Sequence, residues 1–268
     1  KDIDGLEAYR TTVDSTGKRN FPEYTAPKVR QIAVPTTLSG GEFNARAGVT
    51  DPRLKLKQSF VHRGIMPISV ILDGEVTRHT PEWLFLSTGI RAVDHAVETY
   101  LSLDANDYWD GAALHALHLL SDGLVRVKAD PSDFEARQKC LMGAWLSMTG
   151  IVSGCRLGAS HAIGHILGGT AGVPHGYTSC IMLPPVLEWN KAVNRKRQAN
   201  LSEALGKPNL PASEVLHNLI DSLGMPRRLE AVGVKQEQFE QLAENCMLDD
   251  WTFSNPRKIS NPKQVLEI

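Results

Sequence analysis

The chain has 268 residues, of which 42% are hydrophobic and 22% are charged, so it is long enough for one large domain or two unequal ones. Its formal net charge of -1 excludes the strongly basic balance of a protein that binds nucleic acid or an anionic membrane surface. No apolar run approaches the roughly 20 residues that cross a bilayer, and the first ten residues do not resemble a signal peptide.

The four cysteines are scattered without a CxxC pair, which favours reduced, partly buried thiols and a cytoplasmic location. They are Cys140, Cys155, Cys180 and Cys246. Together with the composition, this spacing predicts a soluble, intracellular, globular protein that binds neither nucleic acid nor membrane.

Residues 1–80 mix short strand-like runs with turns. Runs at 30–37, 45–51 and 68–74 are apolar, are rich in Val or Ile, and end at Pro, Gly, Asp or Thr. Such runs are typical of buried strands, so we expect an α/β portion here.

From residue 81 onward helical periodicity replaces the strand pattern. The first helix is expected after Thr80 as N-cap, with Pro81 in its first turn and an apolar stripe inside it. Further helices are expected at 107–126, 132–152, 158–168, 176–190, 193–205, 211–223 and 235–245. The predicted architecture is an α/β domain over 1–80 followed by an all-α domain over 81–268, with a junction near residue 80 as a natural cleft.

The stretch "HAIGHILGGTAGVPHG" holds a third of the nine histidines. His161 and His165 are four residues apart and would share one helix face, and the glycines before His175 allow the chain to turn back toward them. Three histidines in this arrangement indicate either a functional site or hydrogen-bonded core residues. The spacing matches no standard zinc finger.

A second candidate is "TGIRAVDHAVETY". Arg91, Asp94, His95 and Glu98 lie on one helical stripe. The stripe is either a solvated face or, because small apolar residues surround it, a polar stripe that points inward.

A third candidate is "PTTLSGGEFN", which follows a predicted strand. Hydroxyls and successive backbone N–H groups in such a turn can hold a phosphate or a ribose. The candidate cofactor residues are Thr36, Thr37, Ser39 and Glu42. The alternative is an ordinary polar connection, since no dinucleotide fingerprint is matched.

Taken together, these segments resemble the iron-containing alcohol dehydrogenase superfamily. "STGIRAVDHAVETYLS" is similar to that family's "TGxDAxxHAxE" helix, the histidine stretch to its "HgxxHxLGaxxxxPHG" segment, "IAVPTTLSGGEFN" to its "IPTT" loop, and "NPRKISNPKQVLEI" to its closing "NPR" segment. The resemblance implies a dinucleotide-binding α/β domain, a helical domain of dehydroquinate synthase-like architecture, and a homo-oligomer such as a dimer.

The resemblance also implies site residues. A divalent metal, Fe or Zn, would be held by His95, His161 and His175 together with one aspartate, and His165 would lie near the substrate as a proton-relay candidate. The position of that aspartate is Arg91, and a guanidinium cannot ligate a cation. Maleylacetate reductases, which the chain resembles in this respect, also lack the aspartate and are considered metal-free.

The resemblance therefore leads us to expect NAD- or NADP-dependent hydride transfer between nicotinamide and a small alcohol or ketone such as maleylacetate, with a carboxylate on the substrate. His165, His95 and Arg91 would be the catalytic residues, Arg91 as a substrate clamp. The family's "GGGS" loop is not found, so we expect the first half of the dinucleotide domain to be missing and this chain alone to bind NAD(P) weakly. The alternatives are a non-catalytic binding or assembly module and, ranked last, a metal-dependent lyase or hydrolase.

Overall fold

The computed structural model describes residues 4–13, 19–23, 25, 27–51 and 56–268. The chain divides into two compact units. One unit consists of residues 1–35 and 41–71, and the other of residues 36–40 and 72–268. The assignment of a dinucleotide-binding domain to 1–80 and a metal and substrate domain to 81–268 remains a prediction.

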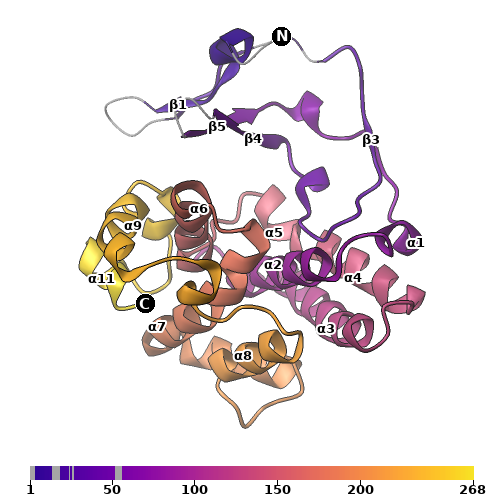
Figure 1. Ribbon diagram of the computed structural model, residues 1–268, viewed down its shortest axis with the longest axis vertical. Helices are drawn as coiled ribbons and strands as arrows, with labels where there is room; N and C mark the ends of the chain where they lie inside the picture. Colours follow the sequence, from indigo (N-terminus) through magenta and orange to yellow (C-terminus); the bar gives the residue numbers. More distant parts are fainter. Residues whose placement is uncertain (1–3, 14–18, 24, 26, 52–55) are drawn as a thin grey trace. The chain divides into compact units, whose positions relative to one another are not determined.

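The first unit contains short strands in three two-stranded sheets (Figure 1). β1 (Thr12–Val13) pairs antiparallel with β2 (Arg19–Asn20), and β4 (Arg46–Asp51) pairs antiparallel with β5 (Leu56–Val61). β3 (Ile32–Ala33) and β6 (Ser69–Val70) form a parallel pair. Three short 3-10 helices are η1 (Asp4–Tyr9), η2 (Gly41–Phe43) and η3 (Arg63–Ile65).

All three predicted strand regions contain strands, although the strands are shorter than predicted at 30–37 and 68–74. β5 was not predicted, because "LKQSFV" lacks the Val- and Ile-rich character used to recognise buried strands. The parallel pair and the helices that follow it confirm the predicted fold class, an α/β portion followed by a helical one.

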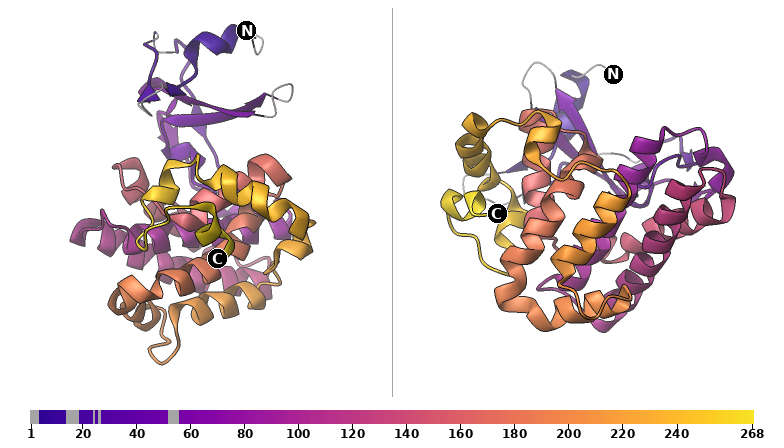
Figure 2. Two further views of the ribbon diagram at one scale, coloured as in Figure 1. Left: turned by 90° about the vertical axis from the view of Figure 1, so that its left-hand side faces the viewer. Right: turned by 60° about the horizontal axis from the view of Figure 1, so that its bottom comes forward.

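The second unit is helical (Figures 1 and 2). Its helices, in chain order, are α1 (Gly74–Thr77), α2 (Glu82–Leu101), α3 (Asp107–Ala129), α4 (Phe134–Ser147), α5 (Thr149–Val152), α6 (Ala159–Ala171), α7 (His175–Ala204), α8 (Ala212–Ser222), η4 (Leu229–Val232), η5 (Gln236–Gln238), α9 (Phe239–Cys246), α10 (Asp250–Phe253) and α11 (Pro262–Leu266). None of the helices in the described part of the chain combines the length and the apolarity that crossing a bilayer requires.

Two local predictions differ from the structure. Thr80 was expected to cap the first helix, but Pro81 holds the N-cap position of α2 and the Thr80 hydroxyl donates instead to the Thr36 carbonyl over 2.7 Å. The helices expected at 176–190 and 193–205 form one element, α7, whose backbone leaves helical geometry at Asn194 alone (φ -131, ψ 26). The two predicted helices are therefore both present, and the break between them is a kink at Asn194 instead of a turn at 191–192.

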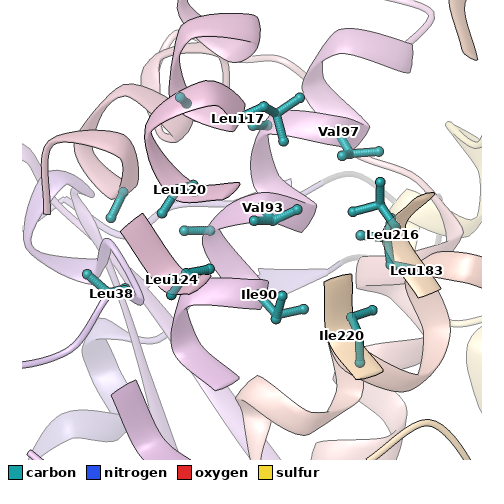
Figure 3. Packing of buried hydrophobic residues seen from close by; sticks show 14 of the residues in the cluster. Leu38, Ile90, Val93, Val97, Leu117, Leu120, Leu124, Leu183, Leu216 and Ile220 are labelled. Carbon is teal, nitrogen blue, oxygen red and sulfur yellow. The ribbon is translucent and has the colours of Figure 1, made fainter. Parts of the chain in front are cut away.

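α2 lies at the centre of the helical unit and is almost entirely buried. Figure 3 shows its residues Ile90, Val93 and Val97 packing among leucines of α3 and residues of α7 and α8. Each such side chain stabilises the folded protein by roughly 1.5–3 kcal/mol when it is fully buried. A helix buried on all sides has no solvated face for charged residues, so the polar side chains of α2 must find partners inside the protein.

Candidate active site

The charged stripe of α2 points inward. Arg91, Asp94, His95 and Glu98 are only 2%, 0%, 7% and 6% exposed. The inward-facing interpretation is thus confirmed and the solvated-face alternative is wrong. Because an unpaired buried charge costs several kcal/mol, this stripe requires an organised set of partners.

Arg91 and Asp94 form a buried ion pair that a serine bridges. Arg91 Nη1 lies 4.0 Å from Asp94 Oδ2 and donates to Ser179 Oγ over 3.0 Å. The Ser179 hydroxyl in turn donates to Asp94 Oδ2 over 2.7 Å, and Ser160 Oγ donates to the same oxygen over 2.8 Å. Burial lowers the pKa of Arg91 and raises that of Asp94 to about 6, while the mutual attraction of the two groups opposes both shifts.

Glu98 caps the N-terminus of α6 from a different helix. Its carboxylate accepts hydrogen bonds from the backbone N–H groups of Gly158, Ser160 and His161 at 3.0, 3.0 and 3.3 Å. Gly158 is the N-cap residue and has no side chain to do this. Burial and the nearby Asp94 raise the pKa of Glu98 to about 8, whereas the three backbone bonds favour the ionised form. Glu98 thereby fixes α6, the helix that carries two histidines, against α2.

The four histidines singled out by the sequence lie in a row. Ring centroids are 4.9 Å apart for His95 and His161, 6.4 Å for His161 and His165, and 6.0 Å for His165 and His175. α6 ends at Gly172, whose φ of 69° lies in the left-handed region that glycine favours, and α7 starts three residues later at His175. The glycine turn therefore brings His175 back to His165, as the sequence predicted.

Two glycines allow the helices around this row to approach closely. A Cβ atom at Gly164 of α6 would lie 2.9 Å from Thr178 Oγ1 of α7, and one at Gly176 of α7 would lie 2.7 Å from the backbone carbon of Ser87 in α2. Any larger residue at these positions would force the helices apart. The small residues between the histidines are thus needed to hold α2, α6 and α7 together around the site.

The inner histidines are neutral and partly unsatisfied. His161 Nδ1 lies 2.8 Å from Glu98 Oε2, so the imidazole and the carboxyl group share one hydrogen. Its Nε2, and Nδ1 of His95, are buried without a hydrogen-bond partner among the described residues. Burial first, and then the positive charge of Arg91, lower the pKa of both histidines well below the usual value.

The outer histidine, His165, has a partner that the sequence did not reveal. Its Nδ1 lies 2.8 Å from Oδ2 of Asp249, 84 residues further along the chain. The indole ring of Trp251 packs against the same imidazole, with centroids 5.2 Å apart. Sequence reasoning also missed Ser160 and Ser179. The one local signal was "DDW" shortly before the "NPR" segment, since Asp is a common N-cap residue.

A divalent cation does not fit this cluster. Among the described residues, one group of three potential ligands has its atoms within 4.8 Å of one another, and it is Asp94, Glu98 and His161 rather than the implied set of His95, His161 and His175. Both oxygens of Glu98 and one of Asp94 already accept hydrogen bonds. The guanidinium of Arg91, 4.0 Å from Asp94, would repel a cation strongly in this water-excluded position.

The candidate cofactor loop is attached to the helical unit. Within residues 36–40, the backbone N–H of Leu38 donates to Thr88 Oγ1 of α2 over 3.1 Å, and the hydroxyls of Thr37 and Ser39 lie 3.4 Å apart. Ser39 is exposed. Glu42 belongs to the first unit, where burial raises its pKa. The structure therefore places Thr36, Thr37 and Ser39 on one anchored loop.

Comparison with known proteins agrees with this arrangement. Residues 85–268 match the model of the Fe-containing alcohol dehydrogenase family, C-terminal. Dehydrogenase ALT3 of Alternaria alternata is 35% identical, over 88% of this chain and 69% of its own. The 1,3-propanediol dehydrogenase of Citrobacter freundii is 32% identical, over 91% of this chain and 65% of its own length. The maleylacetate reductase of Burkholderia cepacia is 31% identical, over 85% of this chain and 63% of its own length.

Solved structures give the same result. Maleylacetate reductase from Rhizobium sp. aligns with a TM-score of 0.78 at 28% identity, covering 88% of this chain and 65% of that one. Sulfoacetaldehyde reductase from Bifidobacterium kashiwanohense, solved in complex with NAD+, aligns with a TM-score of 0.80 at 25% identity, covering 94% and 65%. The chain spans about two thirds of the length of these relatives.

A helical unit with a row of four histidines, of which His95 and His161 are buried, and a family match over most of its length define an oxidoreductase architecture. The chain belongs to the Fe-containing alcohol dehydrogenase family.

Proposed function

We propose that the protein is an NAD(P)-dependent carbonyl reductase or alcohol dehydrogenase whose site works without a divalent metal. The observation that carries this proposal is the buried Arg91, which is bound to Ser179 and Asp94 beside a row of four histidines. A fixed positive charge next to neutral imidazoles suits a reaction in which negative charge develops on a substrate oxygen.

In this proposal Arg91 acts mainly through its charge. Only 3% of its side chain is exposed and its Nη1 is bound to Ser179, which leaves it poorly placed to grip a substrate carboxylate with two parallel hydrogen bonds. A rigid, desolvated guanidinium stabilises a nearby anion more strongly than one in water. Arg91 thus favours the alkoxide-like transition state and attracts an anionic substrate, while His95 lines the same site.

His165 is the proposed proton donor. It is the outer histidine of the row with a carboxylate partner, and 33% of its side chain is exposed, so it can exchange protons with solvent. His95 and His161 are buried and stay neutral, which suits them to orient the substrate oxygen rather than to protonate it.

The proposed cofactor is NAD or NADP, which when bound supplies the hydride. A relative from Bacillus methanolicus is named NAD-dependent methanol dehydrogenase, and the sulfoacetaldehyde reductase was solved with NAD+. In this chain the hydroxyls of Thr36, Thr37 and Ser39 suit a ribose or phosphate, and Glu42 remains a predicted contributor.

The proposed substrate is a small aldehyde or ketone that bears an acidic group. Relatives are named for propanediol, methanol and maleylacetate, and a structural neighbour for sulfoacetaldehyde. Maleylacetate and sulfoacetaldehyde are anions. Among these compounds, only an anion is attracted by the part of the Arg91 charge that Asp94 does not neutralise. A homo-oligomer, such as a dimer, and a cytoplasmic location stay predictions.

The test is cofactor binding followed by turnover. Full-length protein is titrated calorimetrically with NADH and NADPH, and oxidation of the tighter-binding one is then followed with aldehydes matched in length, with and without a terminal carboxylate. We expect one reduced nucleotide to bind and the carboxylate-bearing aldehyde to have the higher kcat/KM. Binding of neither nucleotide would remove the dehydrogenase proposal in favour of a binding or assembly module.

A further inference from the structure

We propose that Asp249 and Trp251 are positioning residues for His165: they fix its ring and keep a proton on Nδ1, so that the substrate's proton is exchanged at Nε2. This inference deepens the proposed function and rests on it for its catalytic meaning. Its structural part concerns the tautomer of one imidazole and can be measured without any turnover.

The orientation of the Asp249 carboxylate is set by the backbone. Asp249 is the N-cap residue of α10, and its Oδ1 accepts the backbone N–H of Trp251 over 2.9 Å. The other oxygen, Oδ2, is thereby directed at His165 Nδ1, which lies 2.8 Å away. An ionised carboxylate only accepts hydrogen bonds, so Nδ1 must be the nitrogen that carries the hydrogen.

Two neighbouring rings restrict the His165 imidazole. Trp251 packs at 5.2 Å with an interplanar angle of 33°, and His175 stacks at 6.0 Å with an angle of 3°. Trp251 also contacts His161 edge-on at 5.7 Å. A ring that packs against two neighbouring rings and is hydrogen-bonded at Nδ1 cannot rotate freely, so Nε2 keeps one direction.

The chemical step balances. As the carbonyl carbon of the substrate receives the hydride that a reduced nicotinamide supplies, the carbonyl oxygen forms a bond to the Nε2 proton of the doubly protonated His165, the N–H bond breaks, and the ring becomes the neutral Nδ1–H imidazole. The imidazole keeps its Nδ1 proton, which the Asp249 carboxylate holds, and Nε2 is reprotonated from solvent. Asp249 therefore decides which of the two nitrogens gives up a proton.

Asp249→Asn tests this inference directly, because the N-cap hydrogen bond to the Trp251 N–H fixes which way the new amide group points. The amide oxygen of Asn is needed to accept the Trp251 N–H, as Asp249 Oδ1 does now. The amide NH2 group then faces His165, where it donates to Nδ1 and forces the ring hydrogen onto Nε2. Helix capping is kept, because Asn caps about as well as Asp. The matched control is Asp250→Asn, the exposed neighbouring acid.

The readouts are the His165 tautomer, from two-bond ¹H–¹⁵N NMR correlations, and steady-state kinetics with the nicotinamide cofactor and the carboxylate-bearing aldehyde. We expect Nδ1–H in the wild type and in Asp250→Asn, and Nε2–H in Asp249→Asn. We also expect kcat of Asp249→Asn to fall by about 100-fold with KM changed less than about 3-fold. Trp251→Phe, which keeps a ring, should lower kcat by only about 3-fold.

An Asp249→Asn protein that keeps Nδ1–H, or whose kcat matches that of Asp250→Asn, would overturn the inference. A wild-type protein that shows the expected tautomer but does not oxidise either nucleotide would contradict the proposed function instead, while the NMR comparison still decides the role of Asp249.

Discussion

The site contains two histidine–carboxylate pairs with the same contact distance and different surroundings. His161 Nδ1 meets Glu98 Oε2 at 2.8 Å, and His165 Nδ1 meets Asp249 Oδ2 at 2.8 Å. The side chains of the inner pair are 1% and 6% exposed, whereas those of the outer pair are 33% and 19% exposed. In the proposed function, the same contact distance therefore belongs to a fixed structural pair inside the protein and to a proton-exchanging pair near solvent.

The inner pair lies among further buried charged side chains, whereas the outer pair is partly exposed to solvent. Glu98 caps α6 and lies on the same helix stripe as Asp94 and Arg91. Changes to the inner group should therefore alter stability and charge balance, and changes to the outer pair should alter turnover while the protein stays folded.

The largest expected effect is on the outer pair. Replacement His165→Gln removes the proposed proton donor, so we expect kcat to fall by about 100- to 10,000-fold with a melting temperature close to that of the wild type. Initial rates and thermal unfolding would be measured on the same preparations. His118→Gln, an exposed histidine of α3, is the control. If His165→Gln lowers the melting temperature but leaves kcat unchanged, the outer pair contributes to stability and not to turnover, which contradicts the proposed difference between the two pairs.

The next effect is on the inner group. Arg91→Leu leaves Asp94 buried without its counter-ion, which should lower the free energy of unfolding by about 3–5 kcal/mol. The double variant Arg91→Leu, Asp94→Asn should recover a large part of this loss, because neither charge is then buried alone. Urea unfolding of the three proteins gives the comparison. A single Arg91→Leu variant as stable as the wild type would show that the pair is not electrostatically important.

A further effect is the pH dependence of stability. Burial raises the pKa of Glu98 from 4.5 to about 8, so the folded protein holds a proton that the unfolded chain releases. The resulting contribution to stability is fully present below about pH 4.5 and is lost as the pH rises toward 8. Denaturant midpoints between pH 5 and 8.5 should decline less steeply for Glu98→Gln than for the wild type. Equal slopes would show that Glu98 is ionised throughout this range.

The proximity of the inner group was easier to predict from the sequence than the contact between His165 and Asp249. Arg91, Asp94, His95 and Glu98 share one helix face, and the spacing of His161 and His165 follows from helical periodicity, so their proximity is a local property of the chain. The return of His175 was predictable because Gly172 permits a left-handed turn.

Contacts between distant segments were not predictable in the same way. Asp249 meets His165 across 84 residues, and Ser179 meets Asp94 across 85, so no periodicity connects them. The cap of α2 was wrongly assigned to Thr80 for a related reason, since its hydroxyl is drawn to Thr36 by a tertiary contact. Only the packing of α6 and α7 against α2, and of α10 against α6, brings these groups together.

The central claim is that the buried guanidinium of Arg91 occupies the charge position that a divalent cation would otherwise fill. Elemental analysis of the purified full-length protein, before and after incubation with Fe²⁺ or Zn²⁺ and desalting, tests it most directly, with Arg91→Asp as the matched variant. We predict well below one metal ion per wild-type chain, carbonyl reduction that survives a chelator, and metal uptake by Arg91→Asp. One tightly bound iron or zinc per wild-type chain would contradict the account.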